Sequence, residues 1–415
     1  MGICDENDRY SHNDWQVIMI NVKSIHELDV KGKKVLCRFD FNVPIKEGVI
    51  EDDRRLREAL PTIQYLIEKG AKIIMTSHLG RPKGKRTKEL TLLPVAKKLS
   101  ELLGKEVKFV DEVVGDKVTR EVEGLGNGEL LLLENVRFHP GEEANDPEFA
   151  GELASPASVY VNDAFGTAHR KHASTYGVAK IIKEKAAGFL MEKEIKNLSK
   201  LHENPPSPFT LILGGAKLKT KIPVIKDLAS LVDNLLVGGG MAFSFLYKKG
   251  IDVGDSLLDE SLFDDIDNLL PIIRDNDVNL LMPLDVVIAK EIKEGVENKV
   301  VPVESIPEGW KGVDIGPITI EEFRRVIIES KTLFWNGPMG VFEIHPFDKG
   351  TKEIAISIGE ATKNGAITVV GGGDTDKAIE ESGVELTHLS TGGGASLKFL
   401  SGEEMPAISV LGEGI

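Results

Sequence analysis

The stretch Ile367-Thr-Val-Val-Gly-Gly-Gly-Asp-Thr375 joins a β-branched apolar run to three glycines, and residues 376–381 then have the pattern of a helix. Glycines at a strand end let a phosphate approach the backbone, and the N–H groups at the start of the next helix bind it. Five more apolar runs in the second half end in glycines or in a Pro/Gly turn, at residues 209–217, 235–240, 280–285, 332–340 and 389–394. The repeated pattern predicts an α/β protein whose strand ends bind a nucleotide.

The first half of the chain also alternates strand and helix patterns. Apolar runs predict strands at residues 34–39, 72–75, 107–110, 130–133 and 159–161, and amphipathic patterns predict helices at residues 53–69 and 93–103. Such alternation indicates βαβ units, and a length of 415 residues exceeds one comfortable core. The predicted fold class is therefore α/β, with two similar doubly wound, Rossmann-like domains built on parallel sheets.

Prolines set the predicted domain boundary. A helical segment up to residue 201 runs into Asn204-Pro-Pro-Ser-Pro208, where proline cannot continue a helix. We therefore predict a first domain at residues 19–201 and a second at residues 202–400. Residues 1–18 lack apolar periodicity and are expected to be a flexible N-terminal extension, whereas residues 401–415 are apolar enough to dock on the protein.

Composition narrows the classes of partner. The net charge is -15, from 51 Lys and Arg against 66 Asp and Glu, which argues against a nucleic-acid binder and against an anionic-membrane binder. The only two cysteines, Cys4 and Cys37, cannot form a disulfide framework, and no apolar run approaches the roughly 18 residues that span a bilayer. We expect a cytoplasmic protein in which any anion site is a local concentration of positive charge.

Loops rich in arginine and histidine follow the strands predicted in the first half. Asp40 and Asn42 point the same way after the first strand, and the cationic residues at this and later strand ends are Arg54, Arg55, His78, Arg81, Arg137, His139, His169, Arg170 and His172. Doubly wound sheets bring such strand ends to one crevice, and planar guanidinium groups suit carboxylate and phosphate. This predicts a site for a small, multiply anionic substrate, in which His78 and His169 bind rather than transfer protons.

The second half contains two kinds of candidate phosphate ligand. Lys217 and Lys221 are four residues apart and would share one helical face, whereas Lys219 is expected to be solvated. Asp374 is as well explained as a helix N-cap as by a position facing Mg²⁺. No segment has the spacing of a Walker A loop or of a strand followed by G-x-G-x-x-G, which disfavours a P-loop NTPase and an ordinary dinucleotide-dependent dehydrogenase.

Taken in order, these motifs resemble those of the phosphoglycerate kinase family from residue 35 to residue 400. The matching segments include Arg38-Phe-Asp-Phe-Asn-Val-Pro44, Ser77-His-Leu-Gly-Arg-Pro82, Asn162-Asp-Ala-Phe-Gly-Thr-Ala-His-Arg170, Gly214-Gly-Ala-Lys217, Trp335-Asn-Gly-Pro338, Gly371-Gly-Gly-Asp-Thr375 and Ser390-Thr-Gly-Gly-Gly-Ala-Ser396. The resemblance implies two domains joined by a hinge, with 3-phosphoglycerate or 1,3-bisphosphoglycerate on the first and Mg²⁺ with ATP or ADP on the second. It also implies a C-terminal tail packed on the first domain.

The resemblance further implies roles for individual residues. The phosphoglycerate ligands would be Asp40, Asn42, Arg55, His78, Arg81, Arg137 and Arg170. The nucleotide ligands would be Lys217, Lys221, Glu343, Gly371, Gly372, Gly373, Asp374 and Thr375, with Asp374 facing the metal. Arg55, Lys217 and the backbone N–H groups near Gly373 and Gly393 would stabilise the phosphoryl group in flight. We expect a monomer that transfers the group in line after domain closure, with no nucleic-acid or membrane partner.

Some alternatives remain open on the sequence. Arg54 stands beside Arg55 and would take the substrate role if the register slipped by one, although Arg55 has the spacing R-x-x-x-x-L-P to Leu60 and Pro61. Residues 1–18 have no counterpart in the family pattern, and we assign them no function. Two other functions are a nucleotide- or phosphate-binding protein without catalysis, and a kinase for a different carboxylate on the same scaffold.

Overall fold

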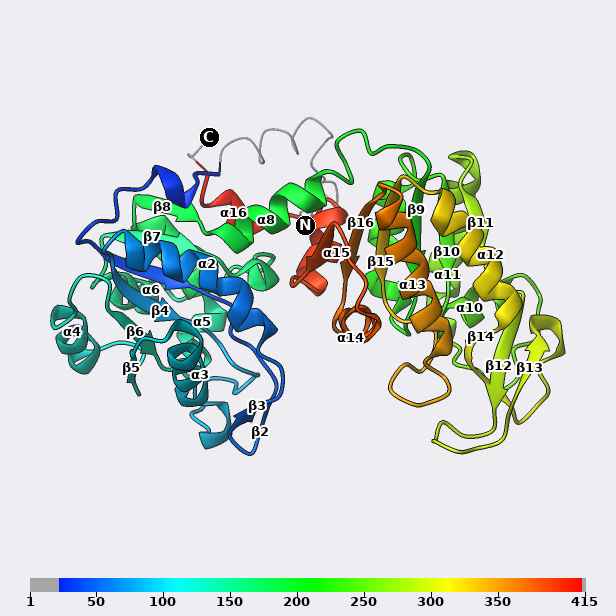
Figure 1. The fold of residues 1–415 in the computed structure, drawn as a ribbon, viewed down its shortest axis with the longest axis horizontal. Coiled ribbons are helices and arrows are strands. Elements are labelled where there is room, and N and C mark those ends of the chain that lie inside the picture. The colour runs from blue at the N-terminus through cyan, green and yellow to red at the C-terminus, as the bar shows by residue number, and fades with distance from the viewer. Residues whose placement is uncertain (1–21, 413–415) are drawn as a thin grey trace, which may run out of the picture. The chain divides into compact units, whose positions relative to one another are not determined.

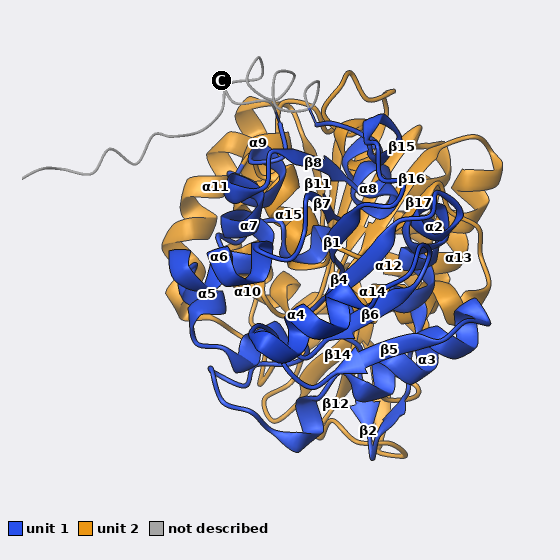
Figure 2. Cartoon of the chain, turned by 90° about the vertical axis from the view of Figure 1, so that its left-hand side faces the viewer, with its two compact units in different colours: residues 1–196, 403–415 blue, residues 197–402 orange. Residues whose placement is uncertain are grey.

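The computed structural model describes residues 22–412, so the predicted extension at residues 1–18 lies outside the described residues. The described chain forms two compact units: residues 22–196 with 403–412 make unit 1, and residues 197–402 make unit 2 (Figure 2). The chain passes between the units within helix α8 (Phe189–Ser199) and again after Gly402. The boundary expected at residues 201–202 lies five residues beyond the first of these crossings.

Unit 1 is built on a parallel six-stranded sheet with the strand order β5-β6-β4-β1-β7-β8 (Figure 1). The strands are β1 (Lys34–Arg38), β4 (Lys72–Thr76), β5 (Val107–Val110), β6 (Leu130–Leu133), β7 (Val159–Asn162) and β8 (Glu184–Ala187). A small hairpin pairs β2 (Ile45–Lys46) with β3 (Val49–Ile50). The connection after β1 leads to strands on one side of it, whereas β7 and β8 lie on its other side. Ligands of doubly wound proteins bind at such a switch point, here between β1 and β7.

Helices cover both faces of this sheet. They are α2 (Arg54–Glu68), α3 (Leu93–Leu103), α4 (Asp116–Glu123), α5 (Gly141–Ala144), α6 (Pro147–Ala154), α7 (Val178–Ile181), the start of α8 and α16 (Pro406–Ser409). In α2 the fully buried residues Leu56, Ala59, Ile63 and Leu66 recur every three or four positions, as one helical face requires. They pack with Val35, Cys37 and other side chains from one face of the strands.

Unit 2 repeats the plan with the strand order β11-β10-β9-β15-β16-β17, again all parallel. The strands are β9 (Phe209–Leu213), β10 (Asn234–Val237), β11 (Asn279–Leu281), β15 (Thr332–Asn336), β16 (Ile367–Gly371) and β17 (His388–Ser390). The helices are α9 (Ile222–Leu228), α10 (Met241–Lys248), α11 (Phe263–Asp275), α12 (Pro317–Glu329), α13 (Lys349–Lys363), α14 (Gly373–Ser382) and α15 (Gly394–Leu400). The switch point here lies between β9 and β15.

The six runs that end in turn residues correspond to the six strands of the unit 2 sheet, and the predicted fold class is confirmed. Several elements were not predicted, including the β2-β3 hairpin and the helices α4 to α7. Two others are also β-structure. One is β8, whose sequence Glu-Lys-Ala-Ala lacks β-branched residues. The other is an antiparallel sheet of β12 (Asp285–Ala289), β13 (Asn298–Pro302) and β14 (Lys311–Ile315). No described helix has the length and apolar character needed to cross a membrane.

Candidate functional site

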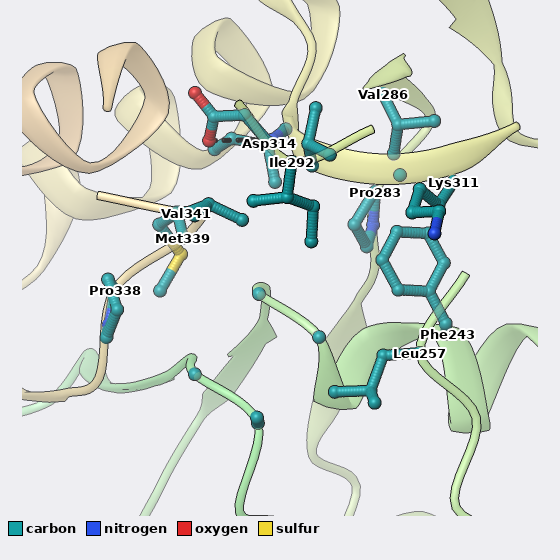
Figure 3. A pocket seen from close by; sticks show the side chains of 18 of the residues that line it. Phe243, Leu257, Pro283, Val286, Ile292, Lys311, Asp314, Pro338, Met339 and Val341 are labelled. Atoms are coloured by element: carbon teal, nitrogen blue, oxygen red, sulfur yellow. Dashed lines mark hydrogen bonds between the residues drawn. The ribbon is translucent and has the colours of Figure 1, made fainter. Parts of the chain in front are cut away.

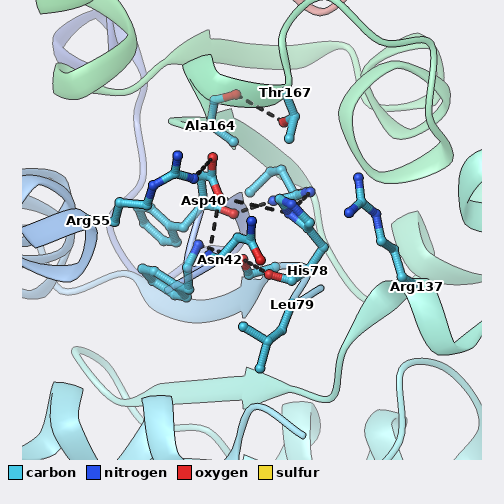
Figure 4. A network of polar contacts seen from close by, with 12 residues as sticks. Asp40, Asn42, Arg55, His78, Leu79, Arg137, Ala164 and Thr167 are labelled. Carbon is cyan, nitrogen blue, oxygen red and sulfur yellow. Dashed lines mark hydrogen bonds and ion pairs between the residues drawn. The ribbon is translucent and has the colours of Figure 1, made fainter. Parts of the chain in front are cut away.

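In unit 1, the residues predicted to bind the anionic substrate follow neighbouring strands. Asp40 and Asn42 follow β1, His78 follows β4, and Arg137 lies in the turn η3 (Val136–Phe138) after β6. Asn42 Oδ1 accepts a hydrogen bond from the Gly80 N–H at 2.9 Å, which ties the loops after β1 and β4 together. Figure 4 shows these side chains around Asp40. The sheet edge therefore gathers them as the sequence pattern predicted.

Asp40 is held by an arginine from α2. Arg55 Nη1 donates to Asp40 Oδ2 at 2.5 Å, and His78 Nδ1 lies 3.9 Å from Asp40 Oδ1. Burial alone would raise the pKa of Asp40, but the charge of Arg55 and the nearby His78 and Arg38 together hold that pKa well below its usual range. Asp40 is therefore ionised and orients Arg55.

Arg38, the last residue of β1, has no exposed surface and was not among the predicted site residues. Its Nε donates to Ser174 Oγ at 2.8 Å, its Nη2 donates to His78 Nδ1 at 3.1 Å, and its Nη1 donates to the carbonyl oxygen of Phe39. The one signal in the sequence is a charged residue that ends an apolar strand. A buried charge is costly unless it is paired, so Arg38 points to an organised polar interior.

The surroundings of Arg137 are the strongest indication of an anion site in unit 1. Its side chain is 3% exposed, Nη1 donates to the Gly80 carbonyl oxygen at 2.7 Å, and Nε lies 3.2 Å from Glu143 Oε1. Its buried Nη2 has no hydrogen-bond partner among the described residues. Burial, followed by the charges of Arg170 and Arg38, lowers the pKa of Arg137 to about 10, although Glu143 and Glu142 oppose the shift. An anion bound here would supply both a partner and a countercharge.

Arg170 and Arg81 extend this positive cluster. Arg170 is half-buried, and its Nε donates to His169 Nε2 at 3.0 Å. Burial lowers the pKa of Arg170, and the charge of exposed Arg81 lowers it further, so the two guanidinium groups are close enough to repel. Several arginines near one another, with one open donor, are chemically suited to a multiply charged anion.

Unit 2 contains a cavity of about 320 Å³ at the carboxyl ends of its strands. Its walls are mostly apolar side chains, shown in Figure 3: Phe243, Leu257, Pro283, Val286, Ile292, Met339 and Val341. Glycine turns after β9 and β10 form another wall, where a Cβ on Gly239 would lie 2.3 Å from the backbone nitrogen of Gly215. Exposed Glu343 and Asp374 also line the cavity. An apolar slot with a few polar groups fits a flat, polar-edged ligand such as a nucleobase.

The two lysines after β9 have different surroundings. Lys221 is 5% exposed, and its Nζ donates to the Gly214 carbonyl oxygen at 2.6 Å. Burial lowers the pKa of Lys221 to about 8, assisted by the charge of Lys217 and opposed by that of Asp374. Lys217 is exposed and precedes the turn η6 (Leu218–Thr220), so the two lysines do not share one α-helix as expected. Their charges nevertheless act on one another near the cavity.

The glycine-rich loop runs from β16 into α14. Gly371 ends the strand, Gly372 has a φ of 121°, and Gly373 starts the helix. The Thr375 hydroxyl donates to the carbonyl oxygens of Gly371 at 3.0 Å and Gly372 at 2.7 Å, so in this structure it stabilises the loop instead of facing the cavity. Gly393 holds the corresponding position before α15, with a φ of 53°.

Asp374 is the one predicted metal ligand, and the donor set around it fits a metal bound together with a nucleotide. Among residues 22–412 no group of three or more His, Cys, Asp or Glu side chains is arranged to hold an ion. Mg²⁺ commonly takes one or two protein carboxylates and completes its shell with phosphate oxygens and water. Asp374, an exposed carboxylate that lines the cavity, matches that mode.

Asp314 is a cavity residue that the sequence did not indicate. It is 3% exposed and accepts hydrogen bonds from the N–H groups of Ile315 at 2.8 Å and Gly350 at 2.7 Å. Burial outweighs these bonds and raises the pKa of Asp314 to about 8. It joins β14 to the start of α13 and so supports the cavity wall, a role that depends on contacts distant in sequence.

The comparisons with known proteins point to one family. The family model described as phosphoglycerate kinase matches residues 25–403. Two curated relatives, both named phosphoglycerate kinase, are 52% identical: one from Thermosipho africanus over 93% of this chain and 96% of its own length, and one from Dictyoglomus turgidum over 94% and 98%. Solved phosphoglycerate kinase structures from Coxiella burnetii and Pyrococcus horikoshii match with TM-scores of 0.83 and 0.80 at 38% and 33% identity. Each covers 94% of this chain and 98% of its own.

Proposed function

The chain belongs to the phosphoglycerate kinase family, and from that premise we propose which of its residues perform the family's reaction. This glycolytic reaction is a reversible phosphoryl transfer between 1,3-bisphosphoglycerate and ADP, which gives 3-phosphoglycerate and ATP. The observation that carries the proposal is the buried Nη2 of Arg137, which lacks a protein partner within a cluster of arginines.

In unit 1 we assign the phosphoglycerate to Asp40, Asn42, Arg55, His78, Arg81, Arg137 and Arg170. The phosphate would take the open donor of Arg137 and the guanidinium groups of Arg170 and Arg81, because repulsion among these charges falls when an anion binds. Asp40 and His78 would meet the glycerate hydroxyl and carboxyl groups, with Asp40 also holding Arg55 in place.

In unit 2 we assign the nucleotide to the 320 Å³ cavity and the loops at its rim. The base would lie between the apolar walls, and Glu343 would accept hydrogen bonds from the ribose hydroxyl groups. Lys217, Lys221 and the N–H groups of residues 371–375 would meet the phosphates, since the start of α14 offers free backbone donors. Thr375 would contribute its own N–H while its hydroxyl remains bonded within the loop.

The family generally uses a magnesium nucleotide, and we propose Asp374 as the protein ligand. When bound there, Mg²⁺ supplies charge neutralisation for the nucleotide phosphates. The nearby Lys217 and Lys221 would supply fixed positive charge on the same phosphate chain.

For the transfer, we propose that Arg55, Lys217 and the backbone N–H groups at Gly373 and Gly393 stabilise the group in flight. In the direction of ATP synthesis, the bond between phosphorus and the acyl oxygen breaks while a β-phosphate oxygen of ADP bonds to the same phosphorus. The carboxylate of 3-phosphoglycerate leaves, and no proton needs to move. Since each substrate is assigned to its own unit, the proposal includes a hinge motion that closes the units and excludes water.

We further propose a cytoplasmic monomer whose partners are these small molecules, without nucleic-acid or membrane partners. The net charge of -15 and the absence of a membrane-crossing helix among the described residues support this assignment.

The test is ADP formation from ATP by the purified full chain, with and without Mg²⁺ and with and without 3-phosphoglycerate. Turnover that requires all three components is the expected result. Nucleotide binding without turnover would favour a binding protein that lost catalysis. Turnover with another phosphorylated acid, but not with 3-phosphoglycerate, would favour a different carboxylate kinase.

A further inference from the structure

Arg38 links the Asp40 site of unit 1 to two side chains from other segments, Ser174 and Glu142. All three are fully buried, and neither Ser174 nor Glu142 belongs to the substrate site assigned above. Arg38 Nε donates to Ser174 Oγ at 2.8 Å, and Ser174 Oγ lies 2.6 Å from Glu142 Oε1. The Ser174 N–H also donates to Glu142 Oε2 at 2.9 Å.

The direction of each hydrogen bond from Arg38 through Ser174 to Glu142 follows from the donor and acceptor properties of the groups. A guanidinium group only donates, so Ser174 Oγ accepts from Arg38 and its own hydrogen is directed to Glu142. Glu142 receives two donors from one residue and so holds Ser174 in place. The positive charge of Arg38 is thereby connected, through one hydroxyl, to a buried carboxylate that compensates it.

The same argument fixes the tautomer of His78 at the other end of Arg38. Because Arg38 Nη2 donates to His78 Nδ1 at 3.1 Å, that nitrogen accepts, and the proton of the neutral ring is on Nε2. Burial is the main reason that the pKa of His78 lies well below its ordinary value; Asp40 opposes this effect, whereas Arg38, Arg137 and Arg55 add to it. His78 is therefore a neutral hydrogen-bond donor.

The local backbone presents Ser174 to Arg38. Residues Ala173–Gly177 form the π-helical turn η5, and the Tyr160 hydroxyl donates to the Ser174 carbonyl oxygen at 2.8 Å. Single π-helical turns are uncommon and often occur at functional sites. Glu142 comes from the separate helix α5, so two segments converge on one buried arginine.

We propose that Glu142 and Ser174 are positioning residues, which act through Arg38 to hold the His78 ring with its proton on Nε2, aimed at the phosphoglycerate. The inference rests on the proposed function, in which His78 contacts that substrate. Neither Glu142 nor Ser174 touches the substrate or the reacting atoms.

The first arm of the test measures the His78 tautomer directly. The full chain is labelled with ¹⁵N-histidine, and the His78 signals are assigned by their loss in His78→Gln. We expect a protonated Nε2 and an unprotonated Nδ1 at neutral pH. A charged ring, or a proton on Nδ1, overturns the inference even if the enzyme is fully active.

The second arm removes the hydroxyl with Ser174→Ala. We expect the KM for 3-phosphoglycerate to rise about tenfold, the KM for ATP to stay unchanged, and the His78 signals to show mixed tautomers. Ser174→Thr, which restores a hydroxyl, should recover both readouts. Ser100→Ala is the control, because the Ser100 hydroxyl also makes two hydrogen bonds within unit 1, but both are to backbone groups.

Glu142→Gln replaces Ser174→Ala if the alanine variant does not fold, and the same shifts are expected. A folded variant with unchanged KM and unchanged His78 signals overturns the inference while an active wild type still supports the proposed function. If the wild type has no kinase activity, the proposed function fails, and the tautomer arm still decides the positioning of His78.

Discussion

At the scale of single residues, Arg54 and Arg55 are adjacent in the sequence but differ in what they contact. Arg55 reaches Asp40, and its charge, with that of Arg38, keeps Asp40 ionised. Arg55, which pairs with the Asp40 carboxylate at the sheet edge, is therefore the better candidate to contact the phosphoryl group that is transferred. The ion pair thus favours the register in which Arg55 has the substrate role.

Replacing Arg55 by alanine should lower kcat on the order of 10²-fold or more, because a preorganised charge near the transferring group is lost. Arg54→Ala is the matched control and should leave kcat close to the wild-type value. Steady-state kinetics with 3-phosphoglycerate and ATP measures both. A larger loss in the Arg54 variant would show that the register is wrong by one residue.

Lys217 and Lys219 offer a similar pair in unit 2, since both are exposed and lie two residues apart. With Lys217→Ala we expect kcat to fall on the order of 10²-fold while the nucleotide Kd changes little, because the contact strengthens as charge develops. Lys219→Ala should change neither quantity. Equal losses in kcat and nucleotide affinity for Lys217→Ala would contradict a transition-state role.

At the scale of elements, the turns after the unit 2 strands need glycine because neighbouring backbones approach closely there. Gly239 has a φ of 63°, and a Cβ there would lie 2.3 Å from the Gly215 nitrogen and 2.7 Å from the Pro338 carbonyl oxygen. Gly250 also has a positive φ, of 86°, but its Cβ would meet nothing within 4 Å. Substitution at these two positions therefore distinguishes the energetic cost of a left-handed backbone from the cost of a steric clash with the added Cβ.

Gly250→Ala should therefore lose only about 1–2 kcal/mol of stability, the cost of a left-handed alanine. Gly239→Ala has the same conformational cost, and the added Cβ must also displace the loops that line the cavity. We therefore expect a larger loss of stability and weaker nucleotide binding. Urea denaturation and calorimetric titration with ATP measure the two effects. Equal behaviour of the two variants would show that the Gly239 contact is easily relieved.

The first turn of α8 depends on two side chains from other elements. Thr62 Oγ1 accepts from the Phe189 N–H at 2.9 Å, and Asp163 Oδ1 accepts from the Met191 N–H at 3.0 Å, while Asp163 Oδ2 has no hydrogen-bond partner among the described residues. Burial raises the pKa of Asp163 from 3.8 to about 6 and outweighs the hydrogen bonds to Asp163 from Thr62 and from the Met191 and Leu190 N–H groups. The folded state therefore prefers the protonated carboxyl group.

For an acid whose pKa is raised on folding, stability is greatest at low pH and falls as pH rises from the unfolded pKa to the folded pKa. The free energy of unfolding of the wild type, relative to Asp163→Asn, should thus decrease by up to about 3 kcal/mol between pH 4 and pH 7. Urea denaturation of both proteins across this range gives the difference. A difference that stays constant with pH would mean that Asp163 does not titrate there.

The sequence was sufficient for elements with strong local signals and insufficient for those set by distant contacts. The apolar runs that end in glycines or in a Pro/Gly turn predict all six strands of the unit 2 sheet, because strand and turn preferences agree there. The antiparallel strands β12 to β14 were missed, and so was β8. The grouping of Asp40, Asn42 and His78 after β1 and β4 could be predicted from their place at strand ends. The partners of Arg38 could not, because Glu142 and Ser174 come from segments more than 100 residues away, as the 136-residue separation from Ser174 illustrates.

At the scale of the whole molecule, each proposed binding site is built within one unit. Arg137 and its neighbours belong to unit 1, and the 320 Å³ cavity belongs to unit 2. Binding of one substrate alone should therefore not depend on the residues that hold the other. Catalysis, by contrast, should need both.

Arg137→Ala should weaken 3-phosphoglycerate binding by at least tenfold, because a buried charged donor is lost, and leave the ATP Kd unchanged. Gly239→Ala should show the opposite selectivity. Titration calorimetry with each substrate alone gives the four constants. A change of the ATP Kd in the Arg137 variant would indicate coupling between the units before both substrates are bound.

Unit 1 is assembled from both ends of the described chain. Val22 pairs with Gly412 in an antiparallel bridge, the Ala407 N–H donates to the Ala168 carbonyl oxygen at 3.1 Å, and Glu404 lies 3.2 Å from Lys171. These last two contacts flank Arg170. Residues 403–412 leave the ribosome after all of unit 2, so the continuous unit 2 can finish folding during translation. The loop that carries Arg170 gains these contacts only afterwards, so we expect the proposed phosphoglycerate site to be the last part of the enzyme to mature.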